Sequence, residues 1–172
     1  MNSKVASLLK EQVTKEFFSA YLYLAYSNYY HEKTLDGFGH WFDVQAREEL
    51  DHALKFLKYL QDNNEPVTLE AIDAPDAKFS NIREPLVAAL KHEKYVTSLI
   101  NAIYAEAREV NDYRCCQFLE WFIAEQGEEE KNTSDLIAKY DLFGEDPKGL
   151  YLLNSELKGR QDTTAAAQTT AE

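Results

Sequence analysis

The chain has 172 residues, of which 45% are hydrophobic and 28% charged, and its formal net charge is −12. This size and composition predict one soluble globular domain, and the acidic balance favours cations over nucleic acid as partners. No apolar run approaches the roughly 20 residues that span a bilayer, and the start MNSKVASLLKEQ lacks the basic residues and apolar core of a secretory signal. We therefore expect a cytoplasmic protein that does not contact a membrane.

Five helices are predicted by apolar residues that recur at a helical period between clusters of glycine and proline. The segment NIRE at 81–84 has the form of a capping box at the start of the third helix. A short fifth helix is indicated by Asp146 as its N-cap, Pro147 at its first position and Gly159 beyond its end. The four long helices are expected at about 3–31, 36–62, 81–108 and 112–140.

The lengths of the connections constrain how these helices pack. Short links inside the first and second helix pairs force antiparallel neighbours. The 18 residues at 63–80 can reach about 60 Å, more than the roughly 40 Å length of one helix. We predict an all-α four-helix bundle at 1–160, with one long crossover between the second and third helices and a short fifth helix. The tail at 161–172 has no apolar face and is expected to be disordered.

Each long helix carries polar residues near the middle of the stripe that should face the core. A single acid at such a place is more often a side chain at the edge of a stripe, and a single histidine is more often a hydrogen-bonded core residue. The predicted stripes are Leu9, Val13, Glu16, Ala20, Tyr23 and Ser27; Phe38, Phe42, Gln45, Glu49, His52 and Phe56; Leu86, Leu90, Glu93, Val96 and Ile100; and Leu119, Phe122, Gln126, Glu129, Thr133 and Leu136.

A repeated spacing shows that these polar residues belong together. Glu93 follows Glu16 by 77 residues, and the pair at 126 and 129 follows Glu49 and His52 by the same 77. The four helices are thus two copies of one hairpin, with their polar residues at one level of the bundle. Buried carboxylates at one level repel each other and lose hydration, so they need cations. A glutamate from each of two helices with Glu-x-x-His on the other two is the pattern of di-iron carboxylate bundles, and the sequence predicts two divalent metal ions.

The chain resembles a bacterial non-haem ferritin over essentially all of residues 1–160. The likeness rests on the segments TKEFFSAYLY, AREELDHA, LKHEKY, FLEWFIAEQGEEEK and GLYLLNSEL, which occur in the family's order and spacing. The resemblance implies a first iron site at Glu16, Glu49 and His52. It implies a second iron at Glu93 and Glu129, with Glu49 as the bridge between the two.

The same resemblance assigns roles to further residues around the pair of irons. Gln126 stands where the family has a glutamine near the dioxygen side, and Tyr23 matches a tyrosine beside the centre that is a plausible electron donor. Glu48, Glu125 and Glu128 match a third iron site that faces a mineral cavity. The implied function is iron storage and detoxification: Fe(II) is oxidised with dioxygen or peroxide, and a ferric mineral is deposited inside a homo-oligomeric shell of twenty-four identical subunits.

Two departures from related families narrow the resemblance. A bacterioferritin would repeat Glu-x-x-His on the fourth helix and bind haem through a methionine, but this chain has Gln-x-x-Glu there and only Met1. No haem is therefore expected. A rubrerythrin would add CxxC pairs, which this sequence lacks.

Gly127 is unusual in the middle of a helix. It is either a neutral substitution at an exposed position or a residue that leaves room beside the third site.

Two other functions stay open on the sequence. The same ligands would serve another di-iron oxidase or a peroxide reductase, since fold and metal site do not dictate the substrate. A metal-free helical scaffold that binds a partner is the alternative from a different class. If the metal reading holds, His52 in one hairpin and Glu129 in the other predict two iron sites of different affinity.

Overall fold

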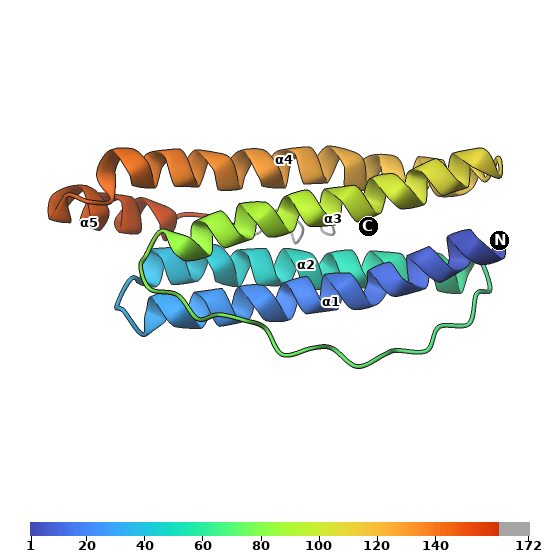
Figure 1. The fold of residues 1–172 in the computed structure, drawn as a ribbon, viewed down its shortest axis with the longest axis horizontal. Coiled ribbons are helices and arrows are strands. Elements are labelled where there is room, and N and C mark those ends of the chain that lie inside the picture. The colour runs from blue at the N-terminus through green and yellow to red at the C-terminus, as the bar shows by residue number, and fades with distance from the viewer. Residues whose placement is uncertain (162–172) are drawn as a thin grey trace, which may run out of the picture.

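The computed structural model describes residues 1–161, which form five helices and no strand (Figure 1). The predicted all-α architecture is confirmed. Most of the tail predicted at 161–172 lies outside the described residues, so its disorder stays a prediction. The helices are α1 (Ser3–His31), α2 (Asp36–Asp62), α3 (Glu84–Glu109), α4 (Tyr113–Phe143) and α5 (Pro147–Leu157).

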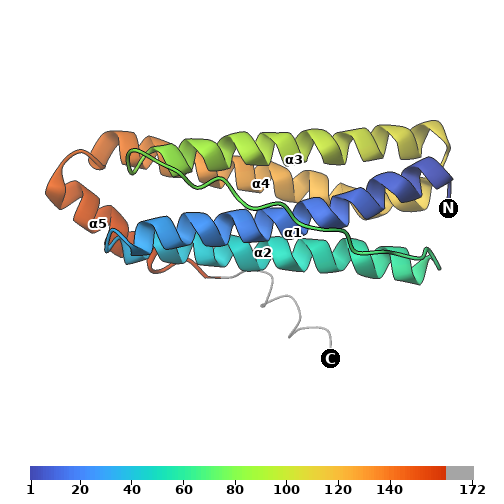
Figure 2. The same cartoon turned by 60° about the horizontal axis from the view of Figure 1, so that its bottom comes forward.

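The four long helices pack as two antiparallel hairpins, α1 with α2 and α3 with α4 (Figure 1). The connection between the hairpins runs the length of the bundle over α1 before it reaches the start of α3 (Figure 2). Near its end, the ring of Phe79 packs edge-on against Tyr26 and Tyr29 of α1, with ring centroids 5.0 and 5.3 Å apart. The long crossover predicted from its number of residues is therefore present.

The first turn of α3 differs from its prediction. The helix begins at Glu84, three residues later than expected. The capping contacts nonetheless form, since Asn81 Oδ1 accepts the backbone N–H groups of Arg83 and Glu84 at 3.0 and 3.1 Å. The Glu84 carboxylate accepts the Ser80 N–H at 2.6 Å. The NIRE motif thus caps a turn that leads into the helix, and the predicted boundary was wrong for that reason.

An aspartate side chain caps the start of each of the last two helices. Asp112 accepts the Cys115 N–H at 3.1 Å at the start of α4, and Asp146 accepts the Gly149 N–H at 2.7 Å at the start of α5. Helix α4 ends at Phe143, three residues beyond the expected end. The predicted fifth helix is confirmed, and it lies at the end of the bundle that holds the α1–α2 turn (Figure 1).

The apolar core is divided into two clusters. One surrounds the α1–α2 turn and includes Tyr30 and Phe38, and the other lies toward the opposite end and includes Leu9 and Phe56. The predicted inward stripes are buried except at Leu90, which is only half-buried. Ala89 is buried in its place, because the alternating steps of three and four residues along α3 pass through 89. Among the described residues, no helix is long and apolar enough to cross a membrane.

Candidate metal centre

A layer of acids separates the two apolar clusters. Glu16 reaches it from α1, Glu49 and His52 from α2, Glu93 from α3 and Glu129 from α4. Each of these side chains is at most 5% exposed. On every helix the residues one turn before and after these side chains on the same face are mostly apolar. When these apolar residues pack in the two clusters, the acids and His52 are buried between them.

The side chains in this layer form groups that could hold a metal ion. In each group, one ligand atom per residue lies within 4.8 Å of the others. Two groups share Glu49, so the bridging role that the resemblance implies for Glu49 is sterically possible and stays a prediction. The groups are Glu16, Glu49 and His52; Glu49, Glu93 and Glu129; and His52, Glu125 and Glu129.

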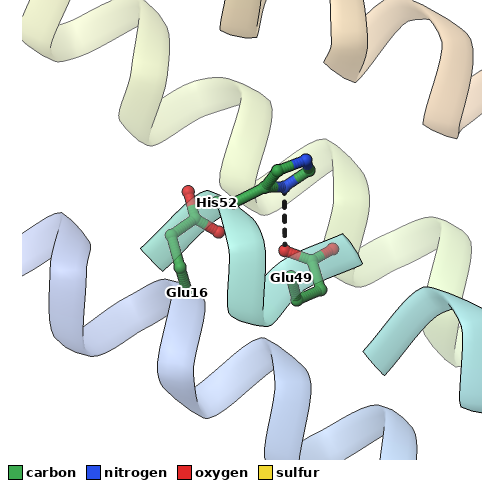
Figure 3. A group of neighbouring side chains, drawn as sticks. All are labelled: Glu16, Glu49 and His52. Atoms are coloured by element: carbon green, nitrogen blue, oxygen red, sulfur yellow. Dashed lines mark ion pairs between the residues drawn. The ribbon is translucent and has the colours of Figure 1, made fainter. Parts of the chain in front are cut away.

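The first group comes entirely from one hairpin (Figure 3). Glu16 projects from α1 toward Glu49 and His52 on the facing side of α2, where the i, i+3 spacing puts both on one face. His52 Nδ1 lies 3.4 Å from Glu49 Oε2. Burial lowers the pKa of His52, so the ring is neutral near pH 7 and the contact is not a charge pair. A neutral imidazole is the form that binds metal.

Glutamine side chains donate hydrogen bonds to one carboxylate oxygen of each of several acids. Gln12 Nε2 donates to Glu16 Oε1 at 2.8 Å, and each of these residues lies on α1. Gln45 Nε2 donates to Glu129 Oε1 at 3.0 Å and to Glu49 Oε1 at 3.4 Å. Neutral amide donors fix the direction of the carboxylates without cancelling their charge, so the other oxygens remain available to a cation.

Glu93 is held by donors on both of its oxygens. The Tyr23 hydroxyl donates to Oε1, and Gln126 Nε2 donates to Oε2 at 3.1 Å. Gln126 Nε2 also lies 3.3 Å from the Glu93 backbone carbonyl. Gln126 therefore positions Glu93 in this structure. Burial, followed by the charges of Glu93 and Glu49, raises the pKa of Tyr23 well above its usual value, so the phenol remains a donor.

Several buried polar atoms in the layer have no hydrogen-bond partner among the described residues. They are Glu16 Oε2, Glu49 Oε2, Glu129 Oε2, His52 Nδ1 and His52 Nε2. Leaving such atoms unpaired in a protein interior costs free energy, and nearly all buried polar groups are paired. The three carboxylate oxygens and one of the two nitrogens of the neutral imidazole can act as acceptors together, and they converge from three helices. A divalent cation with oxygen and imidazole ligands fits this set.

The raised pKa values of the buried acids also favour a bound cation at this layer. Burial raises the pKa of Glu16 and Glu93 above the ordinary 4.5, and that of Glu49 and Glu129 well above it. The negative charge of Glu93 adds to the shift of both Glu49 and Glu129. The raised pKa values favour the protonated acids in the absence of a cation, and a bound cation would displace these protons.

Comparisons with known proteins agree with this geometry. The family model described as ferritin-like domain matches residues 6–143, a range that includes every ligand group. The chain belongs to the ferritin-like family. It is 34% identical over 157 residues to a probable bacterial non-heme ferritin-like protein of Haemophilus influenzae, covering 91% of this chain and 95% of the relative. It is also 34% identical over 158 residues to a bacterial non-heme ferritin of Campylobacter jejuni, covering 92% and 95%.

Solved ferritin structures share the fold. A closed form of the Archaeoglobus fulgidus ferritin, engineered by site-directed mutagenesis, superimposes with a TM-score of 0.92 at 34% identity over 95% of this chain and 99% of that chain. An open-pore ferritin of the same hyperthermophilic archaeon gives 0.91 at 34% identity over 94% and 98%. The resemblance to bacterial non-haem ferritins found in the sequence is confirmed.

The predicted third site of this ferritin-like chain is arranged differently from its expected grouping. Glu125 is half-buried and joins His52 and Glu129. Glu128 is exposed, and the buried Glu48 accepts a hydrogen bond from Arg160 at 2.5 Å. Glu48, Glu125 and Glu128 do not form one ligand group among the described residues. Their joint role as an iron site stays a prediction.

Three residues near the centre were not predicted to take part in it. Gln12 and Gln45 each precede an inward glutamate by four residues, one helical turn, so this spacing could have indicated a donor for each acid. Arg160 contacts Glu48 across 112 positions of sequence. No local pattern predicts that contact, since it depends on how the chain returns after α5.

Proposed function

We propose that the chain stores iron as a ferroxidase, an enzyme that oxidises Fe(II) with dioxygen or peroxide and deposits the ferric product as a mineral. The single observation that carries this proposal is the set of buried acceptor atoms without partners, gathered in two ligand groups that share Glu49. Membership of the ferritin-like family supports it, as do relatives named bacterial non-heme ferritin. Iron is the substrate here, and the ligands do not require haem.

The shared carboxylate explains how one oxidant could receive two electrons. Glu16, Glu49 and His52 would hold one Fe(II), and Glu49, Glu93 and Glu129 the other. Each Fe(II) loses one electron, and dioxygen takes up both electrons with two protons to give hydrogen peroxide. With peroxide as the oxidant, the same two electrons and two protons cleave the O–O bond to give two water molecules. The protein binds the ions side by side and compensates their charge.

Tyr23 and Gln126 would act from the Glu93 side. Both donate to the carboxylate of Glu93 and so fix its direction toward the second ion. We propose that Tyr23, whose hydroxyl contacts a ligand of that ion, also supplies one electron when dioxygen is reduced fully to two water molecules. Two electrons then come from the paired Fe(II) ions, one from Tyr23, which loses its phenolic proton, and one from a further Fe(II), and dioxygen takes up four protons. Gln126 would face the incoming oxidant as a neutral hydrogen-bond donor.

A homo-oligomer of twenty-four copies is part of the proposal. The α1–α2 face carries a groove of about 460 Å³ whose lining includes Tyr21, Leu24, Leu50 and Ile72, all between 42% and 51% exposed. Exposed apolar side chains gathered in one place favour a protein contact. We propose that a second copy of the chain covers this groove in a shell that encloses the mineral.

Loading the metal-free protein with iron tests this function. Fe(II) is added without oxygen, air is admitted, and absorbance and sedimentation are followed. Storage predicts hundreds of iron atoms that stay soluble in a large particle. Oxidation of only two irons per chain, with no mineral, would favour a di-iron oxidase or peroxide reductase. A protein whose stability and absorbance do not respond to Fe(II) would be a metal-free scaffold.

A matched pair of variants tests the site itself. Glu49→Ala/His52→Ala removes members of all three ligand groups, and we expect the initial oxidation rate to fall by about 100-fold or more. Glu120→Ala removes an exposed acid of α4 and should leave the rate at the parental value. Equal rates for the double variant and the parent would refute the site assignment.

A further inference from the structure

Arg160 lies beyond α5, where the chain returns to α2 (Figure 2). Its Nη1 donates to the Trp41 carbonyl at 3.0 Å, and its Nη2 donates to Gln45 Oε1 at 2.9 Å and to Glu48 Oε2 at 2.5 Å. The guanidinium also lies 4.3 Å from the centre of the Trp41 ring, and His40 Nε2 donates to the Arg160 carbonyl at 2.9 Å. These contacts with α2 fix both the backbone of Arg160 and the direction of its side chain.

Helix α5 fixes the place at which the chain reaches α2. Its side chains Leu153 and Leu157 are buried in the cluster around the α1–α2 turn. Asn154 Oδ1 accepts the backbone N–H groups of Gly37 and Phe38, in the first turn of α2, at 2.8 and 3.3 Å. The segment that follows α5 therefore meets α2 at a defined position.

Gln45 lies between this guanidinium and two acids of the metal centre. Its Oε1 accepts from Arg160, while its Nε2 donates to Glu129 Oε1 at 3.0 Å and to Glu49 Oε1 at 3.4 Å. The two ends of an amide are similar in size, and the torsion that exchanges them is roughly two-fold, so the neighbouring donors and acceptors decide its orientation. A carboxyl group accepts when ionised and can donate when protonated, whereas a guanidinium only donates. Arg160 is therefore the partner that keeps Oε1 on its own side and the NH₂ group toward the acids.

The orientation of Gln45 decides which oxygen of each acid faces an ion. Its NH₂ group holds Oε1 of Glu49 and of Glu129, and Oε2 of both acids has no hydrogen-bond partner among the described residues. Both acids belong to the ligand group of the second ion, together with Glu93, whereas the first group contains only Glu49 of the two. A change in the orientation of Gln45 should therefore affect the second ion more than the first.

The other contacts of the guanidinium suit it to this task. Glu48 is only 4% exposed, and its charge balances that of Arg160, so the guanidinium adds no unpaired positive charge beside the metal centre. The Trp41 ring covers one face of the planar cation. Because these two contacts already restrict the guanidinium, little further freedom is lost when it also donates to Gln45.

We propose that Arg160 is a positioning residue of the metal centre, which holds the amide of Gln45 so that Glu49 and Glu129 present Oε2 to the second ion. The inference rests on the proposed function, because the ion concerned is Fe(II). It adds a segment from beyond α5 to a centre whose ligand groups come from the four long helices. Its consequence is selective: binding of the second ion depends on Arg160, and binding of the first depends on it much less.

Calorimetric titration with Co²⁺ under argon tests this role, because it measures binding without oxidation. In the parent we expect two tight ions per chain. The visible absorption of Co²⁺ assigns the two binding steps, since a site with an imidazole ligand and a site with carboxylates alone give different spectra. In Arg160→Gln the step at the carboxylate site should weaken by about tenfold, and the step at the imidazole site should change less.

Lys158→Gln is the matched control for the loss of a nearby charge. It removes a positive charge from an exposed side chain whose Nζ lies 3.8 Å from Asp36. Both affinities should stay at their parental values.

A double-mutant cycle tests whether Arg160 acts through Gln45. Gln45→Met keeps an unbranched side chain and removes both ends of the amide, so the second ion should weaken by about tenfold here as well. In Gln45→Met/Arg160→Gln the loss should be no larger than in either single variant, because no amide is left to orient. Losses that multiply in full would overturn the inference, since Arg160 would then act on the ion by another route.

Circular dichroism checks that Arg160→Gln is folded, because this variant leaves the buried Glu48 without its cation. If it is not folded, Arg160→Lys replaces it in the cycle. The ammonium keeps a charge beside Glu48 but has no planar fork that reaches Glu48, Gln45 and the Trp41 carbonyl together. The second ion should again weaken, and this loss should be absent in the Gln45→Met background. Parental affinities in the folded variant, an equal loss at both ions, or the same loss in Lys158→Gln would overturn the inference.

The titration of the parent distinguishes this inference from the function on which it rests. A parent that binds no Co²⁺ would refute the metal centre and the role of Arg160 together. A parent that binds two tight ions, with Arg160 variants that behave identically to it, would refute only the role of Arg160.

Discussion

The two hairpins of the bundle carry the same positions but do not contribute equally to the metal centre. Glu16, Glu49 and His52 of the α1–α2 hairpin form a complete ligand group by themselves. In the α3–α4 hairpin the equivalent positions hold Glu93, Gln126 and Glu129, and each group that includes one of them also requires Glu49 or His52. A duplicated backbone therefore repeats the geometry, while Gln126 in place of a glutamate and Glu129 in place of a histidine make the second copy depend on the first.

The donors that support the acids differ as well. Gln12 and Gln45 each donate to a glutamate one turn further along their own helix. The equivalent residues of the second hairpin, Ala89 and Phe122, cannot donate. Glu93 is instead held by Gln126 and by Tyr23, which comes from the other hairpin. The first copy is largely self-supporting, and the second is organised across the bundle.

The largest expected effect comes from the residue that the two ligand groups share. Glu49→Ala removes one ligand from both proposed iron sites, and the initial oxidation rate should fall by about 100-fold or more. Gln126→Ala, at the equivalent position, leaves both groups complete and removes a donor to Glu93, so a smaller loss of about tenfold is expected. Stopped-flow absorbance measures both rates. Equal losses would show that Glu49 does not bridge.

Making the hairpins alike should remove their difference in affinity. Gln126→Glu/Glu129→His copies the Glu-x-x-His pair of α2 into α4. In the parent, two Co²⁺ binding steps are expected about tenfold or more apart in affinity, because one site has an imidazole ligand and the other has only carboxylates. In the variant the steps should merge in a calorimetric titration. If the two binding steps stay as far apart as in the parent, residues 126 and 129 do not cause the difference in affinity.

The stability of the metal-free protein should fall as pH rises. Because burial raises the pKa of Glu49 in the folded state, its contribution is fully present below the ordinary value of 4.5 and is lost as pH rises through the raised pKa. Thermal unfolding in the presence of a chelator measures this, with about 2–4 °C expected for each kcal/mol lost. Added Co²⁺ should reverse the loss, because it binds the ionised acids.

A single variant provides the control for this pH dependence. Glu49→Gln makes position 49 neutral at every pH, as Gln126 already is in the other hairpin. Its unfolding midpoint should depend less on pH than that of the parent. A metal-free parent whose midpoint rose between pH 5 and 7 would contradict the shifted pKa values of the acids.

The smallest effect is expected at Gly127, whose counterpart in the first hairpin is Leu50. A Cβ atom added at Gly127 would meet no atom within 4 Å. Gly127→Ala should therefore stabilise α4 by about 1 kcal/mol and raise the unfolding midpoint by about 2–4 °C. Co²⁺ binding should not change. A weakened third ion in this variant would show instead that the glycine provides room beside the third site.

Much of the fold and of the ligand set was predictable from the sequence, because both depend on the regular period of a helix. The alternation of three and four residues placed Glu16, Glu49, His52 and Glu129 on buried faces, and the structure buries them all. The same rule predicted that Leu90 is buried, but Ala89 is buried instead. The prediction was wrong because it chose the larger apolar residue of two adjacent ones. Helix ends were less predictable, as the turn before Glu84 shows.

The sequence by itself determined the bundle, its crossover and the level at which the acids meet, since helical period, chain length and the 77-residue repeat are properties of residue order. Only the tertiary structure decided that Gln126 donates to Glu93, that Glu125 joins His52 and Glu129, and that Arg160 engages Glu48. The reason is physical. These contacts depend on side-chain torsions and on segments brought together by packing, and neither is repeated along the chain.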